Sequence, residues 1–153
     1  MKKVSDSKVV MHELVLPNDT NNLGNVLGGR VMHLMDICAA MSAYKHARSH
    51  VVTASVDNLN FLAPAKKGFI LMLKSSVNFA SKTSMEVGVK IESENPFTGE
   101  IRHTASAYLT FVALDEYGKP KEVAPVSPDT KDEKRRYKEG EKRTLMRKKE
   151  LNA

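Results

Sequence analysis

The feature that most constrains this chain is a long apolar stretch that begins at a glycine pair and contains a single carboxylate. Residues 28–47 place apolar side chains on nearly every side of a helix, and only the last turn is polar. Such a helix is typical of a buried element wrapped by other parts of a fold. Asp36 lies in its middle, between Met35 and Ile37. Because burial of an unpaired carboxylate is costly, a purely structural helix would gain from leucine here. Asp36 is therefore the first candidate for chemistry.

The glycine pair Gly28-Gly29 stands where this helix is expected to begin. Glycine there lets a ligand approach the unpaired backbone N–H groups of a helix N-terminus, which are suitable partners for an oxyanion. Gly28 and Asp36 share roughly one side of the helix but are about 12 Å apart along it. That separation is too long for both to contact one carbonyl group. If both serve one reaction, they should come from different copies of the chain, which suggests a site shared by two subunits.

Length and charge indicate one domain followed by a tail of different character. The chain has 153 residues and a formal net charge of +6. We assign residues 1–125 to the domain and residues 126–153 to a charged tail, expected to be a peripheral helix or partly disordered. Ten Lys and Arg stand against six Asp and Glu from Asp129 onward. The tail offers only a thin apolar stripe, formed by Tyr137, Leu145, Met146 and Leu151.

Several classes of function are disfavoured by composition. Cys38 is the one cysteine, and no signal-peptide-like or membrane-spanning run occurs, which predicts a cytoplasmic protein without membrane contact. The five histidines have no metal-ligand spacing, so we predict no metal site. Tryptophan is absent and aromatic residues are few, which counts against single-strand nucleic-acid binding through the basic tail. We therefore predict no nucleic-acid partner.

Five further segments have the composition of β-strands. They are residues 8–16, 51–61, 69–79, 83–92 and 100–114. In the fourth, Met85, Val87, Val89 and Ile91 alternate with polar residues, which indicates one buried face. One helix followed by consecutive hairpin-connected strands predicts an antiparallel sheet curled around that helix, an α+β layout.

A combined pattern runs through the loop before the helix, the helix itself and the later strands. It consists of Pro17, Asp19, Thr20, Asn21, Gly24, Asn25, Val26, Gly28, Gly29, Met35 and Asp36, then residues 52–57, Asn60-Phe61 with Pro64, and residues 110–115. From about Val10 to Pro125 the chain resembles the acyl-CoA thioesterases of the hotdog fold. The resemblance implies a long helix inside a curved antiparallel sheet. It also implies a homodimer as the minimal active unit, often assembled as a trimer of dimers, with sites between subunits.

The resemblance also assigns catalytic roles. Asp36 is similar to the family's catalytic acid, which acts on an acyl-CoA thioester as general base or as nucleophile. Asn21 of the opposite subunit would orient water or substrate, and Gly28 or Gly29 would supply an oxyanion N–H. The chain departs from many relatives at Leu27, where they have histidine. Each of these residues also has a purely structural interpretation. Asp36 would be a core carboxylate whose hydrogen bonds are satisfied, Asn21 would be a turn residue, and the glycines would only begin the helix.

Coenzyme A would be part of the substrate and product, so the resemblance implies no cofactor. It gives substrate or coenzyme A contacts to Asn60 and to the segment Ser81, Lys82, Thr83 and Ser84. A dehydratase of the same fold would need a histidine base, and His33, one turn before Asp36, is outside the family pattern. A non-catalytic acyl-CoA sensor is the remaining alternative. Such a sensor would bind acyl-CoA without turnover and would tolerate Asp36→Ala.

Overall fold

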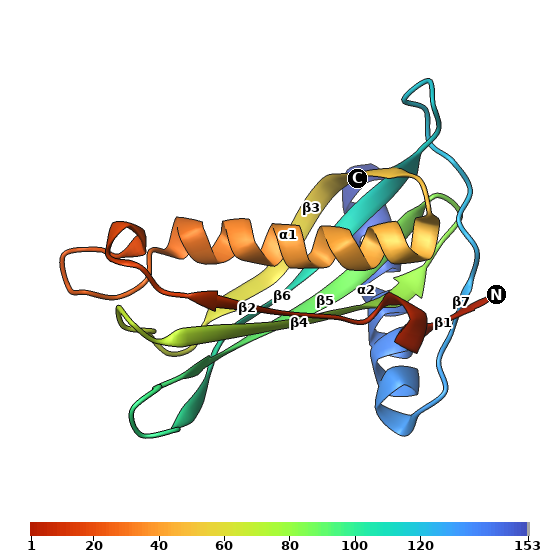
Figure 1. The fold of residues 1–153 in the computed structure, drawn as a ribbon. Helices are drawn as coiled ribbons and strands as arrows, with labels where there is room; N and C mark the ends of the chain where they lie inside the picture. The colour runs from red at the N-terminus through yellow and green to blue at the C-terminus, as the bar shows by residue number, and fades with distance from the viewer. Residues whose placement is uncertain (153) are drawn as a thin grey trace.

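Helix α1 (Gly28–Ala47) lies across one face of a five-stranded antiparallel sheet (Figure 1). The computed structural model describes residues 1–152. The sheet order is β2-β4-β5-β6-β3, with β2 (Val9–Leu14), β3 (His50–Phe61), β4 (Ile70–Ala80), β5 (Ser84–Glu94) and β6 (Ile101–Leu114). All five predicted strands are confirmed, with ends shifted by no more than two residues. The predicted α+β layout of one helix on a curved antiparallel sheet is confirmed as well.

Short elements and a second helix complete the chain. Strand β1 (Lys2–Lys3) pairs in parallel with β7 (Val126–Ser127), and so ties the N-terminus to the segment before the C-terminal helix. The 3₁₀ turn η1 (Val4–Ser7) precedes β2, and η2 (Pro17–Asp19) opens the loop that leads to α1. Helix α2 (Lys131–Asn152) ends the described chain.

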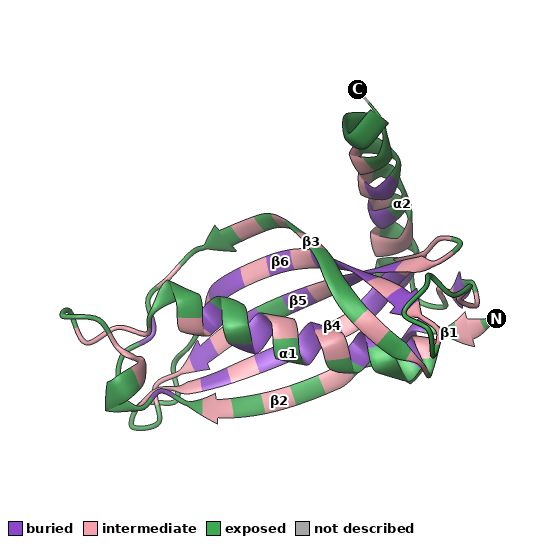
Figure 2. Cartoon of the chain, turned by 90° about the horizontal axis from the view of Figure 1, so that it is seen from above, coloured by how far each residue is buried: buried purple, intermediate pink, exposed green. Residues whose placement is uncertain are grey.

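The hydrophobic core lies between α1 and the sheet. Buried positions alternate with less buried ones along the central strands (Figure 2), as expected where one sheet face is covered. The side chains that face α1 include Leu71, Leu73, Val77, Met85, Val87, Val89, Ile91, Ala105, Ala107, Leu109 and Phe111. On α1 the buried residues recur at helical spacing, at Val31, Leu34, Met35, Cys38, Ala39, Ser42, Ala43 and His46.

Within one chain helix α1 is covered on one side only, whereas its apolar sequence predicts burial on nearly every side. Its outer face exposes Met32, Ile37, Met41 and Tyr44 by between 37% and 46%. The reason is geometrical, because a single sheet covers only one side of a helix. The helix therefore carries an exposed apolar stripe along the side that the sheet does not reach.

Strand β3 forms one edge of the sheet, where within residues 1–152 it pairs only with β6. Its register with β6 shifts twice, between Thr53 and Ser55 and again between Asp57 and Asn60. Asn58, inside the second irregularity, has a φ of 51°. Such bulges bend a strand and redirect its side chains.

Helix α2 packs on the sheet face opposite α1 through Gly140, Arg143 and one residue of the thin apolar stripe, Tyr137. Gly140 lets the helix come close, since a Cβ there would lie 3.0 Å from Glu86 Oε1 and 3.2 Å from Phe79 Cβ. Tyr137 packs edge-on against Phe79, with 5.1 Å between ring centroids. The other three residues predicted for the stripe, Leu145, Met146 and Leu151, are exposed.

Candidate active site

Asp36 and Thr53 bring α1 and β3 together at one point. Thr53 Oγ1 donates a 2.7 Å hydrogen bond to Asp36 Oδ1. Asp36 is half-buried, between buried Met35 and exposed Ile37, because it lies at the rim of the helix face that packs on the sheet. The carboxylate is thus less buried than its sequence neighbours suggest, and it has a defined hydrogen-bond donor.

A largely apolar cavity of about 380 Å³ opens beside this carboxylate. Its volume falls in the range typical of small-molecule sites. The floor comes from β6, through Ala107 and Leu109, and the remaining lining from α1 and β3, namely Gly29, Met32, His33, Met35, Asp36, Thr53, Val56 and Leu59. The arrangement can hold an apolar chain with a carboxylate and a hydroxyl at its side.

The two glycines at the start of α1 differ in their surroundings. Gly29 lines the cavity, and a Cβ on it would meet no atom within 4 Å. A Cβ on Gly28 would lie 3.5 Å from the ring of Phe61, so Gly28 is covered by β3. The N-cap residue, Leu27, forms no side-chain cap hydrogen bond to this helix end. Gly29 is therefore the member of the pair whose backbone borders the cavity.

Asn21 belongs to a tight loop that the chain closes on itself. Its Oδ1 accepts hydrogen bonds from the backbone N–H groups of Leu23 at 3.0 Å and Asn25 at 3.2 Å. The side-chain oxygen is thus used within the loop, while the amide NH₂ remains as a donor. Asn21 is exposed and does not line the cavity beside Asp36.

The predicted coenzyme A contacts lie away from Asp36 within one chain. Asn60 is near the end of β3, where its Nδ2 donates to Asn58 O at 3.0 Å. Ser81, Lys82 and Thr83 form the turn between β4 and β5, and Ser84 is the first residue of β5. The Val123 N–H donates to Lys82 O, and Ala124 O contacts the ring of His46 in the last turn of α1. This turn therefore lies beyond the far end of the helix, and a single chain does not bring it to the cavity.

Two residues of the cavity were not given roles from the sequence. Thr53 lies in the strand motif of residues 52–57, and its hydroxyl could be linked to Asp36 only once the packing of β3 beside α1 was known. His33, predicted to be packed or on the surface, is exposed and also lines the cavity. One turn of helix separates His33 from Asp36, so the spacing in the sequence already indicates that the two side chains lie on the same side of α1.

Cys38 lies two positions after Asp36, about half a helical turn, and is buried. Burial raises the pKa of its thiol, an effect that a hydrogen bond with Ser75 partly opposes. A raised thiol pKa disfavours the nucleophilic thiolate. Within residues 1–152, no His, Cys, Asp and Glu side chains group in a way that could hold a metal ion. No helix in the described chain has the length and apolarity needed to span a membrane.

Comparison with known proteins places this geometry in a family. The family model described as the thioesterase superfamily matches residues 23–99. An acyl-CoA thioester hydrolase of Bacillus subtilis, YkhA, is 44% identical over 128 residues, which are 84% of this chain and 74% of the relative. The mouse cytosolic acyl coenzyme A thioester hydrolase is 37% identical over 95% of this chain, which spans only 39% of that longer protein.

Solved structures agree with the family match. The acyl-CoA hydrolase of Staphylococcus aureus, solved with butyryl coenzyme A, coenzyme A and coenzyme A disulfide, superposes with a TM-score of 0.91 at 42% identity, over 98% of this chain and 92% of that one. A hexameric acyl-CoA thioesterase solved without ligand gives 0.93 at 46% identity, over 97% and 96%. Structures of the S. aureus enzyme also exist with an aspartate, a threonine or an asparagine changed to alanine.

Proposed function

This chain belongs to the thioesterase superfamily of hotdog-fold proteins, among the acyl-CoA thioester hydrolases, and we propose that it hydrolyses acyl-CoA to a free acid and coenzyme A with Asp36 as the reacting carboxylate. The observation that carries the proposal is the 2.7 Å hydrogen bond from Thr53 to Asp36 at the mouth of an apolar cavity. A thioester carbonyl is electrophilic, so one positioned carboxylate and one N–H donor suffice for its hydrolysis.

The spacing of the S. aureus alanine variants supports the choice of residues. In that enzyme the changed asparagine and aspartate are 15 positions apart, and the changed threonine follows the aspartate by 17. Asn21, Asp36 and Thr53 are separated by the same 15 and 17 positions. The three side chains singled out in the relative therefore correspond to two residues predicted here from sequence and one identified from the Asp36 hydrogen bond.

The chemical roles follow from position. The acyl chain lies in the apolar cavity, with its carbonyl carbon near Asp36. As general base, Asp36 takes a proton from the water that attacks this carbon; as nucleophile, its oxygen forms an anhydride that water then cleaves. In the base route the C–S bond breaks as the tetrahedral intermediate collapses, and the proton passes from Asp36 to the coenzyme A thiolate. In the nucleophile route the C–S bond breaks as the anhydride forms, and the water that then hydrolyses the anhydride supplies the proton for the thiolate. The tetrahedral oxyanion is stabilised by the N–H of Gly29 of the partner subunit, because seven residues of helix, about 10 Å, separate Gly29 from Asp36 within one chain. Thr53 keeps the carboxylate oriented.

We propose that the complete site is shared between two subunits. Asn21, Asn60 and the turn from Ser81 to Ser84 do not line the Asp36 cavity of their own chain, so a second chain would present them. The exposed stripe on α1 and the edge of β3 offer apolar surface for that contact, including Val52 at 47% and Val56 at 50% exposure. The hexameric state of a relative fits an assembly of three such dimers.

The cellular location and the need for a cofactor or metal ion remain predictions. We propose a cytoplasmic protein, supported by the mouse relative that is named cytosolic. We propose no cofactor and no metal ion, since coenzyme A arrives as part of the substrate and the cavity offers its own carboxylate and N–H donors.

The proposal is tested by release of free thiol from acyl-CoAs of short, medium and long chain. Turnover of at least one of them is expected, and the preferred chain length would report the depth of the cavity. Binding of acyl-CoA without thiol release from any of them would contradict hydrolysis and would favour a sensor of the same fold.

The shared site has its own test. Chains carrying Asn21→Ala and chains carrying Asp36→Ala are each expected to be nearly inactive. Mixed oligomers are formed by co-expression and isolated through two different affinity tags. In each mixed dimer, one site combines the intact Asp36 of the Asn21→Ala chain with the intact Asn21 of the Asp36→Ala chain. Partial recovery of activity is expected in them. Absence of recovery in verified mixed oligomers, with each parent folded, would contradict a contribution of Asn21 across the interface.

A further inference from the structure

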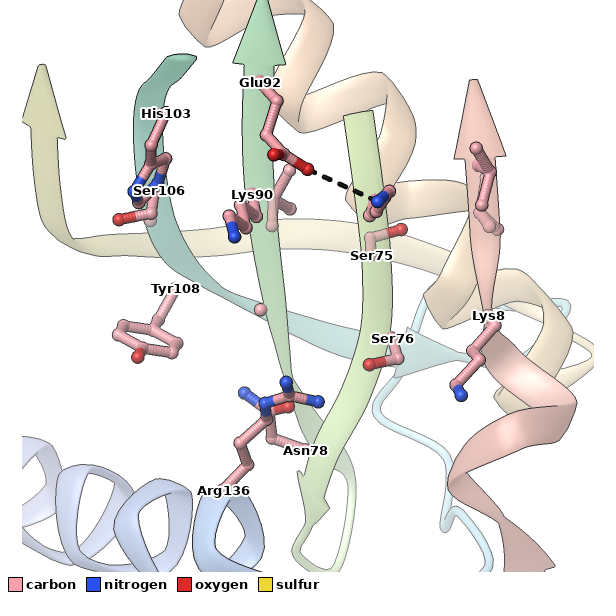
Figure 3. A pocket seen from close by; sticks show the side chains of 16 residues that line it. Lys8, Ser75, Ser76, Asn78, Lys90, Glu92, His103, Ser106, Tyr108 and Arg136 are labelled. Atoms are coloured by element: carbon pink, nitrogen blue, oxygen red, sulfur yellow. Dashed lines mark hydrogen bonds and ion pairs between the residues drawn. The ribbon is translucent and has the colours of Figure 1, made fainter. Parts of the chain in front are cut away.

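A second hollow, of about 580 Å³, lies on the sheet face opposite α1 (Figure 3). It is bounded by α2 on one side and by the start of β2 on another. Its residues come from β4, β5 and β6 together with these two borders, so the hollow does not belong to the Asp36 cavity. Its volume is within the range of small-molecule sites.

The floor of this hollow is a row of three paired residues across three strands, with a glycine at its centre. Ser76, Gly88 and Tyr108 are paired neighbours on β4, β5 and β6. A Cβ at Gly88 would lie 2.8 Å from Asn78 Nδ2, so the floor has no room for a side chain at its centre. The absence of a side chain in mid-strand costs stability, and it makes the sheet surface concave at this place.

Cationic groups rise from both sides of the floor. Arg136 reaches from α2 toward Asn78, while Lys90 projects from β5 (Figure 3). Within the described chain, residues 1–152, neither Lys90 nor Arg136 forms an ion pair with a carboxylate. The further hydrogen-bonding groups around the floor are Ser76, Asn78, His103, Ser106 and Tyr108.

The one carboxylate in the lining is already engaged. Glu92 pairs with Lys74 at 3.3 Å, so it does not neutralise Lys90 or Arg136. Lys8 at the border pairs at 3.9 Å with Glu133, whose side chain also accepts the backbone N–H groups of Asp129 and Thr130. Four cations and one carboxylate therefore line the hollow. Among residues 1–152 neither Lys90 nor Arg136 is held in an ion pair, although the charge of Arg136 also acts on Glu133 at the border.

We propose that this hollow, defined by Gly88, Lys90, Arg136 and Tyr108 with their neighbours, binds the phosphate groups of a small phosphorylated molecule. Arginine and lysine with nearby hydroxyl donors match phosphate oxygens through charge-assisted hydrogen bonds. An ordinary solvated sheet face carries charges of both signs, whereas this one is concave and lacks free carboxylates. The source of the phosphate is either a free compound or the adenosine end of a second coenzyme A molecule.

The test uses the full-length oligomer and calorimetric titration with pyrophosphate, ADP and coenzyme A. Lys90→Gln and Arg136→Gln are each expected to weaken pyrophosphate binding at least 10-fold, since each removes one cation from the floor's edge. Lys119→Gln, in the exposed turn after β6, removes the same charge elsewhere and should change the affinity less than twofold. Thioester hydrolysis without added phosphate compounds should be unchanged in all three variants.

Coenzyme A separates the two sources. A second equivalent of coenzyme A per chain that Lys90→Gln removes would identify coenzyme A itself as the ligand. Binding of pyrophosphate and ADP that depends on Lys90, with no second coenzyme A equivalent, would identify a separate phosphate compound. The proposal is overturned if the wild-type oligomer binds none of the three probes, or if Lys90→Gln and Arg136→Gln bind them as the wild type does. Because hydrolysis is measured in parallel, this outcome would leave the thioesterase proposal untouched.

Discussion

Arg143 holds Glu86 by two hydrogen bonds, from Nε to Oε2 at 2.9 Å and from Nη2 to Oε1 at 2.8 Å. The side chain of Glu86 is fully buried between the sheet and α2. Asn78 Nδ2 donates to the same carboxylate, and the Arg143 guanidinium lies 3.6 Å above the ring centroid of Tyr108. Burial works against the charged guanidinium, but the bonds to Glu86 outweigh it and raise the pKa of Arg143. This pair anchors the C-terminal helix to the sheet.

Replacement of Arg143 by methionine should destabilise the chain by roughly 3–5 kcal/mol, because it leaves the buried Glu86 carboxylate without its cationic partner. Chemical unfolding measures the change. The double variant Glu86→Gln with Arg143→Met should regain most of the loss, since no charge stays buried. Arg135→Met is the matched control, because Arg135 forms only exposed pairs with Asp132 and Glu139. Equal stability of Arg143→Met and Arg135→Met would contradict the anchoring role.

Arg147 connects the same helix to the strand that carries Thr53. Its Nη1 donates a 2.7 Å hydrogen bond to Asp57 Oδ2, beside the second irregularity of β3. We expect Arg147→Met to lower kcat/KM roughly 3- to 10-fold, since a shift of β3 would misplace Thr53 and Val56 at the cavity. Arg147→Lys should retain most of the activity. Unchanged kcat/KM in Arg147→Met would show that α2 does not position the site.

The Thr53 hydroxyl can be removed without changing the size of the side chain. Thr53→Val should lower kcat roughly 10- to 100-fold, because the Asp36 carboxylate loses its orienting donor. Its effect on stability should be near 1 kcal/mol, the usual net contribution of one hydrogen bond. Thr53→Ser keeps the donor and should stay within a few-fold of the wild type. Equal rates for the valine and serine variants would remove this hydrogen bond from the mechanism.

His46 should make stability depend on pH. Burial lowers the pKa of its imidazole, and the nearby cations of Lys2 and the N-terminus act in the same direction, while the hydrogen bond to Ala124 O and the charge of Asp6 oppose it. The buried Nδ1 has no hydrogen-bond partner in the described chain, so a proton added there would have no acceptor. The folded chain therefore binds this proton more weakly than the unfolded chain, and stability is lost as the pH falls below about 6.5.

Unfolding free energies measured from about pH 7.5 to 5 test this expectation. His46→Gln should flatten the decline below about pH 6.5, whatever its effect at neutral pH. His50→Gln, at an exposed histidine, serves as the control and should keep the wild-type slope. A slope in His46→Gln identical to that of the wild type would assign the pH dependence to other groups.

The sequence was informative wherever a local pattern decides the structure. Alternation at Met85, Val87, Val89 and Ile91 fixes which face of β5 is buried, and the glycine pair marks the start of α1. The exposed stripe at Met32, Ile37, Met41 and Tyr44 could not be separated from the buried face, because apolar composition does not tell a sheet contact from a contact with another chain.

Features that depend on contacts between residues far apart in the chain could not be predicted from the sequence. The anchoring of α2 joins Arg143 to Glu86, 57 positions earlier in the chain. Nothing local in the charged tail distinguishes Arg143 from the other tail cations, and of the four apolar residues noted in the tail only Tyr137 packs on the sheet. Thr53 similarly meets Asp36, 17 positions earlier in the chain, only because β3 packs beside α1. Asp36, by contrast, stood out as the only carboxylate of an apolar helix.

The most direct test of this account is the rate of thiol release by Asp36→Asn beside the wild type, with the preferred acyl-CoA at saturation. Asparagine keeps the size of the side chain and can still bond to Thr53, so the fold and acyl-CoA binding should be retained. The account predicts that kcat falls at least about 100-fold, because the proton acceptor or nucleophile is lost. A folded Asp36→Asn oligomer that releases thiol within threefold of the wild-type rate would contradict it.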